Sequence, residues 1–439
     1  MLVRITSMRP LNLLLASLVF TSMAMAATTR NDDSCDIAVA PAATLLLPYF
    51  EVDLDNRVGQ TTIFTVTNVT SVAQIARVTL WTDFAYPVFT FNLYLTGYDV
   101  HTIDLYDVLN GTIRTTGRHG MGAWVSPRGD LSKDNSALDE SECGHLPETI
   151  PQFQVERMHV AFTEGRVPGC DKVGSTHWYA VGYATIDVVG NCGTAIPIDA
   201  EYFTNDLRFD NALIGDYQSV DPGVDFAQAS PMVHIRAIGE RRRGRFTTNL
   251  PRTFYGRFQG PARPNADARQ PLPSTFAARW ANGTATEFQT RFKIWREART
   301  NAAATCRAYA DNARLELAES VVFDEDENGE GEQREPCPVT TCIGKPSIVL
   351  PATSLVSIAD DEIFPQDVID TEASGWAYLN LNDYGFVPRQ AWVVVSMGAE
   401  SRFTIEMDAT PLGNGCSALT DVTSFTDGGA PGVLPGPTP

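Results

Sequence analysis

The chain has 439 residues, 44% of them hydrophobic, and its 53 acidic and 33 basic residues give a formal net charge of −20. A surface of that charge repels nucleic acid and anionic membranes, so nucleic acid is excluded as a partner. The length exceeds what one hydrophobic core usually supports, and two domains are therefore expected.

The first 26 residues have the pattern of a secretory signal peptide. Arg4 and Arg9 precede the apolar stretch Leu11–Phe20, and Ala24–Ala26 supplies the small residues of a cleavage site. The apolar stretch is too short to span a bilayer, and no later window reaches the roughly 18 to 20 apolar residues that a transmembrane helix needs. We therefore expect export by the Sec pathway, no integral membrane segment, and a location in the periplasm or outside the cell. Since the leader carries two Arg and no acid, the mature chain of about 413 residues has a charge of −22.

Short segments rich in β-branched and aromatic residues follow the leader, and such segments are typical of β-strands. Helical periodicity is scarce, and only residues 304–320 could form a helix. Many short strands without interleaved helices predict an all-β fold built from sandwiches. The expected strands are residues 61–70, 73–83, 89–96, 177–189, 347–358, 375–382, 390–397 and 402–409.

Two segments recur in the same order, which indicates an internal duplication. Residues 77–83 resemble residues 291–297 at an offset of 214, and Gly182–Val188 resembles Gly375–Leu381. We therefore expect tandem immunoglobulin-like β-sandwich domains. The boundaries are a signal peptide at 1–26, a first domain with long insertions at 27–240, a Pro/Gly/Arg-rich linker or surface loop at 241–272, a second domain at 273–420, and a disordered tail at 421–439.

The repeated strand alternates apolar residues with polar ones. Leu80 and its counterpart Ile294 lie on the predicted core face, and Trp81 and Trp295 lie on the opposite face among charged residues. Each Trp either forms an aromatic platform for a ligand or is covered by a loop or the sister domain. The second interpretation is favoured, because amphipathic Trp is common at internal interfaces.

All eight cysteines lie after the leader, and an oxidising compartment makes disulfides the leading interpretation. Four fall in each half, so we expect each domain to hold its own disulfides. Zinc binding by Cys337 and Cys342 is the competing interpretation, but no second pair at matching spacing accompanies them. The disulfide-forming residues are Cys35, Cys143, Cys170 and Cys192 in the first half, and Cys306, Cys337, Cys342 and Cys416 in the second.

We assign no catalytic residue from the sequence, because no known nucleophile, phosphate or dinucleotide motif is present. No two of the six His stand at metal-ligand spacing. The stretch Asp199–Asp225 is rich in acids and aromatic residues, and paired carboxylates beside aromatics are what a glycosidase needs. An ordinary solvated acidic loop is the alternative.

The stretch Asp324–Glu335 matches the D-x-[DN]-x-[DN]-G-x5-E pattern of a calcium-binding loop. The residues Pro336-Cys337-Pro338 forbid an exiting helix, so an EF-hand is excluded. Either a calcium loop between strands or an acidic hairpin tip remains, and Ca²⁺ is the cofactor that this stretch suggests. The candidate metal ligands are Asp324, Asp326, Asn328, Glu330 and Glu335.

Several phrases resemble a family of exported bacterial β-rich proteins known only as uncharacterised sequences. The resemblance covers most of the mature chain and implies a shared fold and an envelope or extracellular location, but no activity. We favour a secreted or periplasmic structural or interaction protein, whose partners are envelope proteins or glycans. A polysaccharide-binding or polysaccharide-cleaving protein and a calcium-dependent adhesive module are the alternatives. The phrases are ATLLLPYFEVDLDN (43–56), LYLTGYDVHTIDL (93–105), NALIGDYQSVDP (211–222), PMVHIRAI (231–238), QPLPSTFAARW (270–280) and LGNGC (412–416).

Overall fold

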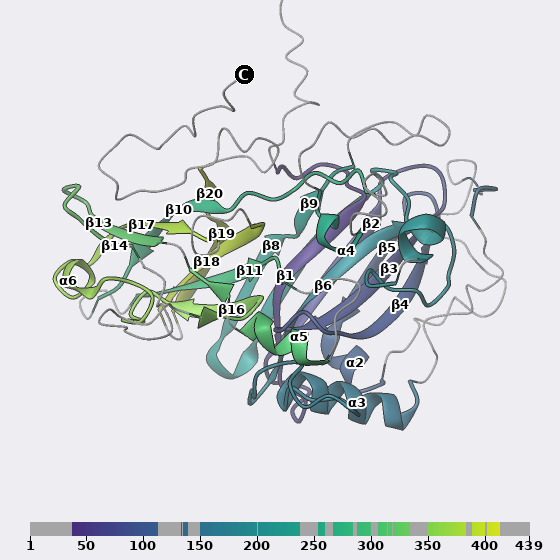
Figure 1. Cartoon of the computed structure of the whole chain (residues 1–439), viewed down its shortest axis with the longest axis horizontal. Coiled ribbons are helices and arrows are strands. Elements are labelled where there is room, and N and C mark those ends of the chain that lie inside the picture. The colour runs from purple at the N-terminus through teal and green to yellow at the C-terminus, as the bar shows by residue number, and fades with distance from the viewer. Residues whose placement is uncertain are drawn as a thin grey trace, which may run out of the picture. The chain divides into compact units, whose positions relative to one another are not determined.

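Antiparallel sheets make up the computed structural model, and they pair into two sandwiches (Figure 1). In the first sandwich, a five-stranded sheet in the order β4-β3-β6-β1-β9 packs on a four-stranded sheet in the order β5-β2-β7-β8. The bounds are β1 (Thr44–Val52), β2 (Thr61–Asn68), β3 (Gln74–Thr82), β4 (Pro87–Leu95), β5 (Val100–Asp104), β6 (Ala180–Val189), β7 (Leu213–Asp221), β8 (Phe226–Pro231) and β9 (Val233–Ile235).

The second sandwich pairs a five-stranded sheet, β14-β13-β17-β10-β20, with a four-stranded sheet, β16-β11-β18-β19. The predicted all-β sandwich fold is confirmed. The bounds are β10 (Thr275–Ala281), β11 (Gln289–Arg296), β13 (Glu319–Asp324), β14 (Gly329–Gln333), β16 (Thr353–Ser357), β17 (Ser374–Asn380), β18 (Ala391–Ala399), β19 (Phe403–Asp408) and β20 (Thr410–Pro411), with the small pair β12 (Leu315–Glu316) and β15 (Val349–Leu350) beside them.

The helical elements are short. They are α2 (Leu105–Leu109), α3 (Gln152–Thr163), α4 (Gly256–Gln259), α5 (Cys306–Ala310) and α6 (Gln366–Ile369), with the turns η2 (Tyr202–Asp206), η3 (Pro222–Val224) and η4 (Asp311–Ala313). The structure describes residues 37–112, 133, 135–138, 150–199, 201–237, 253–259, 267–283, 288–299, 306–313, 315–317, 319–333, 349–382, 389–399 and 402–412. The predicted signal peptide, the predicted tail, five of the cysteines and Glu335 lie outside these residues.

Helix α3 was missed by the sequence analysis. Its buried residues Val155, Met158 and Phe162 recur at helical spacing, so a signal for an amphipathic helix was present in the sequence. The one helix that was expected, at residues 304–320, is right only at its start, in α5 and η4. Its second part forms β12 and the first residues of β13 instead.

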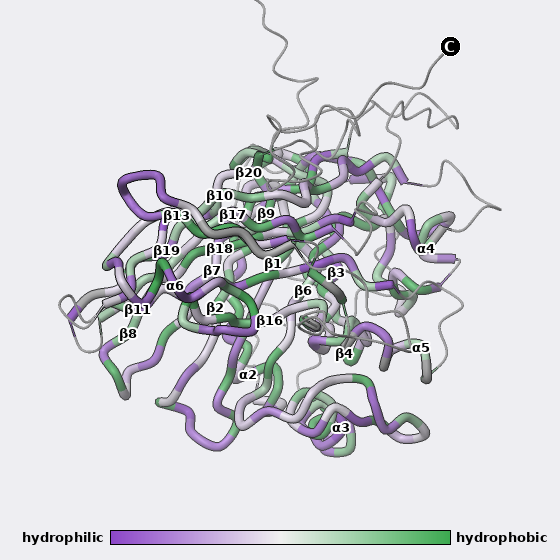
Figure 2. Tube along the Cα trace, turned by 60° about the vertical axis from the view of Figure 1, so that its left-hand side comes forward, coloured by the Kyte–Doolittle hydropathy of each residue, from purple (hydrophilic) through white to green (hydrophobic). Residues whose placement is uncertain are grey.

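Alternation along the strands produces the two cores. In the first sandwich, Leu80 of β3 is fully buried with Phe64 of the opposite sheet, and in the second, Ile294 of β11 is fully buried with Val393 and Phe276. Leu80 and Ile294 therefore belong to different hydrophobic clusters, as predicted. Figure 2 shows the hydrophobic residues concentrated along the strands and a hydrophilic turn beside β13.

The two sandwiches have the same strand order, but the offset of 214 does not describe their equivalence. By sheet position, β3 corresponds to β13 and β11 corresponds to β2, so the strands matched at that offset belong to different sheets. The prediction that β3 and β11 are equivalent strands is therefore wrong. The second matched pair, β6 and β17, does occupy equivalent positions, between β3 and β1 in one half and between β13 and β10 in the other.

The strand registers agree as well as the strand order. Thr44 pairs with Asp187 in the first half, and Thr275 pairs with Asn380 at the equivalent place in the second. Gly182 and Gly375 are also equivalent, and each packs so closely on the backbone oxygen of the neighbouring strand, at Trp81 or Phe323, that a Cβ would collide with it. This agreement supports the duplication hypothesis, which itself stays a prediction.

The expected linker is not a surface loop where it is described. Phe254, Tyr255 and Phe258 are buried, and so are Arg269 and Leu272 further along the segment. Its Pro, Gly and Arg content suggested exposure, whereas its aromatic residues, which the prediction passed over, supply the apolar surface that is buried.

Polar contacts join the two sandwiches across their facing sheets. Lys293 Nζ on β11 lies 3.0 Å from Glu406 Oε2 on β19 and 3.1 Å from Ser219 Oγ on β7. The Tyr217 hydroxyl donates to the other oxygen of Glu406 at 2.5 Å. The described residues from Ile37 onwards form one compact unit.

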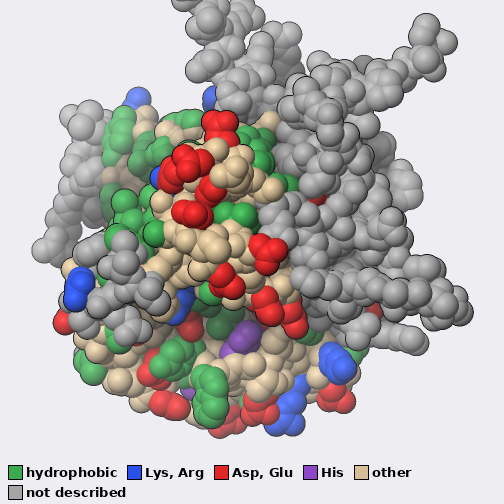
Figure 3. Space-filling model, turned by 90° about the vertical axis from the view of Figure 1, so that its left-hand side faces the viewer, with side chains coloured by type: hydrophobic (Ala, Val, Ile, Leu, Met, Phe, Trp, Pro, Cys, Tyr) green, Lys and Arg blue, Asp and Glu red, His purple; other side chains and the backbone are tan. Residues whose placement is uncertain are grey.

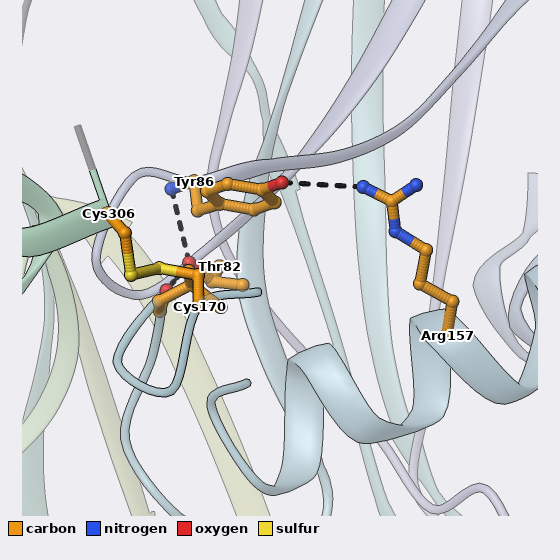
Figure 4. Close-up of a disulfide and its surroundings, with 6 residues drawn as sticks. Thr82, Tyr86, Arg157, Cys170 and Cys306 are labelled. Atoms are coloured by element: carbon orange, nitrogen blue, oxygen red, sulfur yellow. Dashed lines mark hydrogen bonds between the residues drawn. A yellow bond between two sulfur atoms is a disulfide. The ribbon is translucent and has the colours of Figure 1, made fainter. Parts of the chain in front are cut away.

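A disulfide between Cys170 and Cys306 also joins the two halves (Figure 4). The expectation that each half pairs its own cysteines is therefore wrong for these two. The two cysteines pair across the halves because the fold places the loop after α3, which carries Cys170, beside the start of α5, which carries Cys306. Tyr86 and Tyr309 also meet there, edge to face, with ring centres 5.0 Å apart. Cys192 is disulfide-bonded too.

Candidate functional site

The acidic stretch that suggested calcium binding forms the hairpin between β13 and β14. At its turn, Asp324 accepts hydrogen bonds from the backbone N–H of Asn328 at 2.7 Å and from its side-chain amide at 2.8 Å. These bonds hold the pKa of the Asp324 carboxyl below its ordinary value. Glu327 has a left-handed backbone conformation, with φ of 64°, that closes the turn.

The predicted calcium ligands are only partly described. Asp324, Asp326 and Asn328 lie on this turn, only the backbone of Glu330 is described, and Glu335 lies outside the described residues. Among the described residues, no group of three or more His, Cys, Asp or Glu side chains could hold a metal ion. Calcium binding therefore stays a prediction.

The two Trp residues predicted on the outward strand faces are buried and covered. Trp81 and Trp295 are 1% and 2% exposed. Trp81 stacks on Tyr183 with ring centres 5.7 Å apart, and Trp295 meets Tyr183 edge to face. Phe254 stacks on Trp295 at 5.7 Å. Both the sister sandwich and the segment 253–259 thus cover these side chains, as the favoured interpretation predicted.

A small cavity remains within this aromatic cluster. Its free volume is about 10 Å³, room for about one water molecule. The Trp295 indole N–H and Arg257 Nε are buried there without a hydrogen-bond partner among the described residues. The cavity is too small for a sugar ring. The lining residues are Trp81, Tyr183, Thr185, Phe254, Tyr255, Arg257, Phe258 and Trp295.

Asp187 is the centre of a buried polar network next to this cluster. Its Oδ2 accepts hydrogen bonds from the hydroxyls of Tyr202 at 2.6 Å and Tyr255 at 2.7 Å. Burial, and then the negative charge of Asp187, raises the pKa of both Tyr well above the ordinary range, so both hydroxyls stay protonated and donate. The fully buried Arg269 lies 3.7 Å away and supplies the opposite charge.

Three acids of the stretch Asp199–Asp225 have structural partners. Asp206 forms a buried ion pair with Arg77 at 2.5 Å and accepts from the Asn191 amide at 2.7 Å. Asp199 accepts from the backbone of Ile196, and Asp221 accepts from the backbone of Gly223 at the start of η3. Each of these carboxylates therefore fixes a local turn or an interior contact.

Sequence reasoning missed a cluster at the end of β3. Asp83 is buried, its Oδ2 lies 3.2 Å from His177 Nε2, and it accepts from the backbone N–H of Ser175. The side chain of Glu51 accepts from the Tyr49 hydroxyl at 3.2 Å. Burial raises the pKa of Glu51, opposed by Tyr49, Lys293 and His177. No spacing rule finds this cluster, because β1, β3 and the loop before β6 are far apart in the sequence.

An aromatic surface lies on the outer face of the second sandwich. The Arg279 guanidinium stands 5.0 Å from the ring centre of Trp376, and Phe323 contacts Tyr378 at 5.1 Å. Glu325 holds Arg279 through two hydrogen bonds of 2.9 and 2.5 Å and accepts a third from Ser374 at 2.8 Å. The nearby Arg279 lowers the pKa of Glu325, so the carboxyl stays charged and keeps Arg279 in place.

No family model, curated protein or solved structure matches the chain. Among the described residues, no helix is both long and apolar enough to cross a membrane. Any functional conclusion must therefore come from the surfaces and contacts of this chain itself.

Proposed function

We propose that this chain is an exported, non-enzymatic interaction protein that presents the faces of a rigid double sandwich to other macromolecules in the periplasm or outside the cell. The observation that carries this proposal is how the interior polar groups are used. Asp187, Asp206 and Glu406 each bond to side chains from other elements, and Lys293 and the Cys170–Cys306 disulfide tie the halves together. These contacts favour a fixed scaffold.

Export is tested by expressing the full chain in a bacterial host and sequencing the N-terminus of the exported protein. We expect a mature chain that begins at Ala27 and is found in the periplasm or the medium. A variant that lacks Leu11–Phe20 is the control and should stay inside the cell. Recovery of the unprocessed parent chain in the cytoplasm would contradict the proposal.

Polysaccharide binding or cleavage is the second candidate, and one exposed aromatic pair supports it. Trp178 is fully exposed and Tyr179 is partly exposed, directly after His177 of the Asp83 cluster. Aromatic faces stack on the apolar faces of sugar rings. A glycan array, with and without calcium, together with an assay for new reducing ends, separates the candidates. Release of reducing ends would reject the non-enzymatic proposal, and binding only in calcium would favour an adhesive module.

A further inference from the structure

We propose that the outer face of β13 and β17 in the second sandwich binds a peptide segment of a partner protein that carries aromatic side chains and a basic residue. This surface is formed by Phe323, Trp376 and Tyr378, with Arg279 and Glu325 at its edge. The inference rests on the proposed function and names the kind of partner.

The first argument is the use of the same face in the first sandwich. The shared registers make Trp81 equivalent to Phe323, and Tyr183 equivalent to Trp376. In the first half, this face is covered by the chain's own segment 253–259 together with Trp295 of the second sandwich. Phe254 and Phe258 of that segment pack against Trp295 and Trp81, and Tyr255 contacts both Phe residues.

The second argument is that the equivalent face in the second half is open. Trp376 is 38% exposed, while its counterpart Tyr183 is 2% exposed. Phe323 and Tyr378 beside it are partly buried. An exposed large aromatic side chain on a partly apolar sheet face is typical of an interaction surface. Trp376 lies against Arg279, which Glu325 holds in turn, so the surface is ordered in advance and loses little side-chain freedom on binding.

The third argument is charge. Glu325, Asp326 and Glu327 at the hairpin tip are exposed beside this surface. Figure 3 shows acidic side chains gathered on the side of the molecule where β13, β14 and α6 lie in Figure 1. A basic residue in the partner segment fits this border, and the covering segment of the first half has such a residue in Arg257.

The test uses a labelled peptide of sequence TFYGRFQ, which copies residues 253–259, titrated into the complete mature protein and followed by fluorescence anisotropy. We expect saturable binding that weakens at least about tenfold in Trp376→Ala. The variant Asp326→Asn with Glu327→Gln should weaken binding at low salt only, since it removes charge and keeps the Glu325–Arg279 contact and the rings in place. Thermal melts show that each variant is folded.

Two controls make the result specific. Trp178→Ala removes a more exposed Trp elsewhere and should leave the affinity unchanged. A peptide with Ser in place of its three aromatic residues should not bind. Absence of saturable binding, equal binding by Trp376→Ala, or loss of glycan binding in Trp376→Ala without peptide binding would each overturn the inference. The export test and the reducing-end assay are independent of this surface, so its failure is distinguishable from failure of the proposed function.

Discussion

Lys293 and Glu406 form an ion pair that is almost fully removed from solvent, with side chains 6% and 0% exposed. Breaking such a pair by removing one partner leaves a buried charge uncompensated, which costs about 3–5 kcal/mol. We expect Glu406→Gln to lower the free energy of unfolding in urea by this amount. Glu325→Gln, which breaks the exposed pair with Arg279, is the control and should cost less than about 1 kcal/mol. Equal losses would contradict this assignment.

Glu51 should make the stability depend on pH. Burial raises the pKa of its carboxyl above the ordinary value of 4.5, so the folded chain holds this proton more tightly than the unfolded chain. The stabilising contribution is complete below about pH 4.5 and is lost as the pH rises through the raised pKa. In urea titrations across this range, Glu51→Gln should gain stability relative to the parent as the pH rises. A difference that does not change with pH would reject this role.

At the scale of the strands, the equivalent glycines offer a paired test. An added methyl group at Gly182 or Gly375 collides with the backbone of the adjacent strand at Trp81 or Phe323. Overpacking of this kind typically costs about 1–3 kcal/mol. We expect Gly182→Ala and Gly375→Ala to destabilise the protein by similar amounts in urea. A neutral effect at either position would show that the two strand pairs are not packed alike.

The β13–β14 hairpin gives the test of calcium binding. Its exposed carboxylates repel one another, and a bound cation would relieve that repulsion. At a calcium concentration a hundredfold above the dissociation constant, the gain is about 2.7 kcal/mol. We expect a higher melting temperature in millimolar calcium than in chelator, and loss of this shift when Asp324→Ala and Asp326→Ala are combined. An unchanged melting temperature in the parent chain would end the calcium hypothesis.

The strands show what could be predicted from sequence. Alternation correctly placed Leu80 in the core of the first sandwich and Trp81 on the opposite face of β3, because side chains alternate between the two faces of a strand. The offset of 214 failed for the same reason: strands with one apolar face resemble each other whatever their place in a sheet. The equivalent of β3 is β13, which shares little of its sequence. The place of a strand in a sheet depends on partner strands that are distant in the sequence, so it cannot be predicted from the residues of that strand alone.

The candidate sites were harder to predict from the sequence than the strands, because they are formed by contacts between distant segments. In the sequence, Trp376 has the features of an ordinary strand residue. The strand registers make it equivalent to Tyr183, which is buried, whereas Trp376 is exposed. The buried role of segment 253–259 was predictable in part, since a run with three aromatic residues is poorly suited to a solvated linker. What this segment covers is decided by the fold alone.

For the whole molecule, the disulfide between the halves should contribute directly to stability. Removing a native disulfide typically costs about 2–5 kcal/mol. We expect this loss in urea when Cys170→Ser and Cys306→Ser are combined, and peptide mapping without reductant should recover the Cys170–Cys306 link from the parent. A parent that yields other partners for either cysteine would contradict the cross-half pairing.

The same bond has a mechanical consequence for a protein that is held by its ends. The residues from Cys170 to Cys306, a sequence separation of 136, form a covalent ring closed by the disulfide, and this ring bears no load when the chain is pulled. Those residues would add roughly 450 to 490 Å to a fully stretched chain if the ring were opened. Oxidation therefore fixes the reach of the protein under tension, and a reducing environment would make it a longer and more compliant tether.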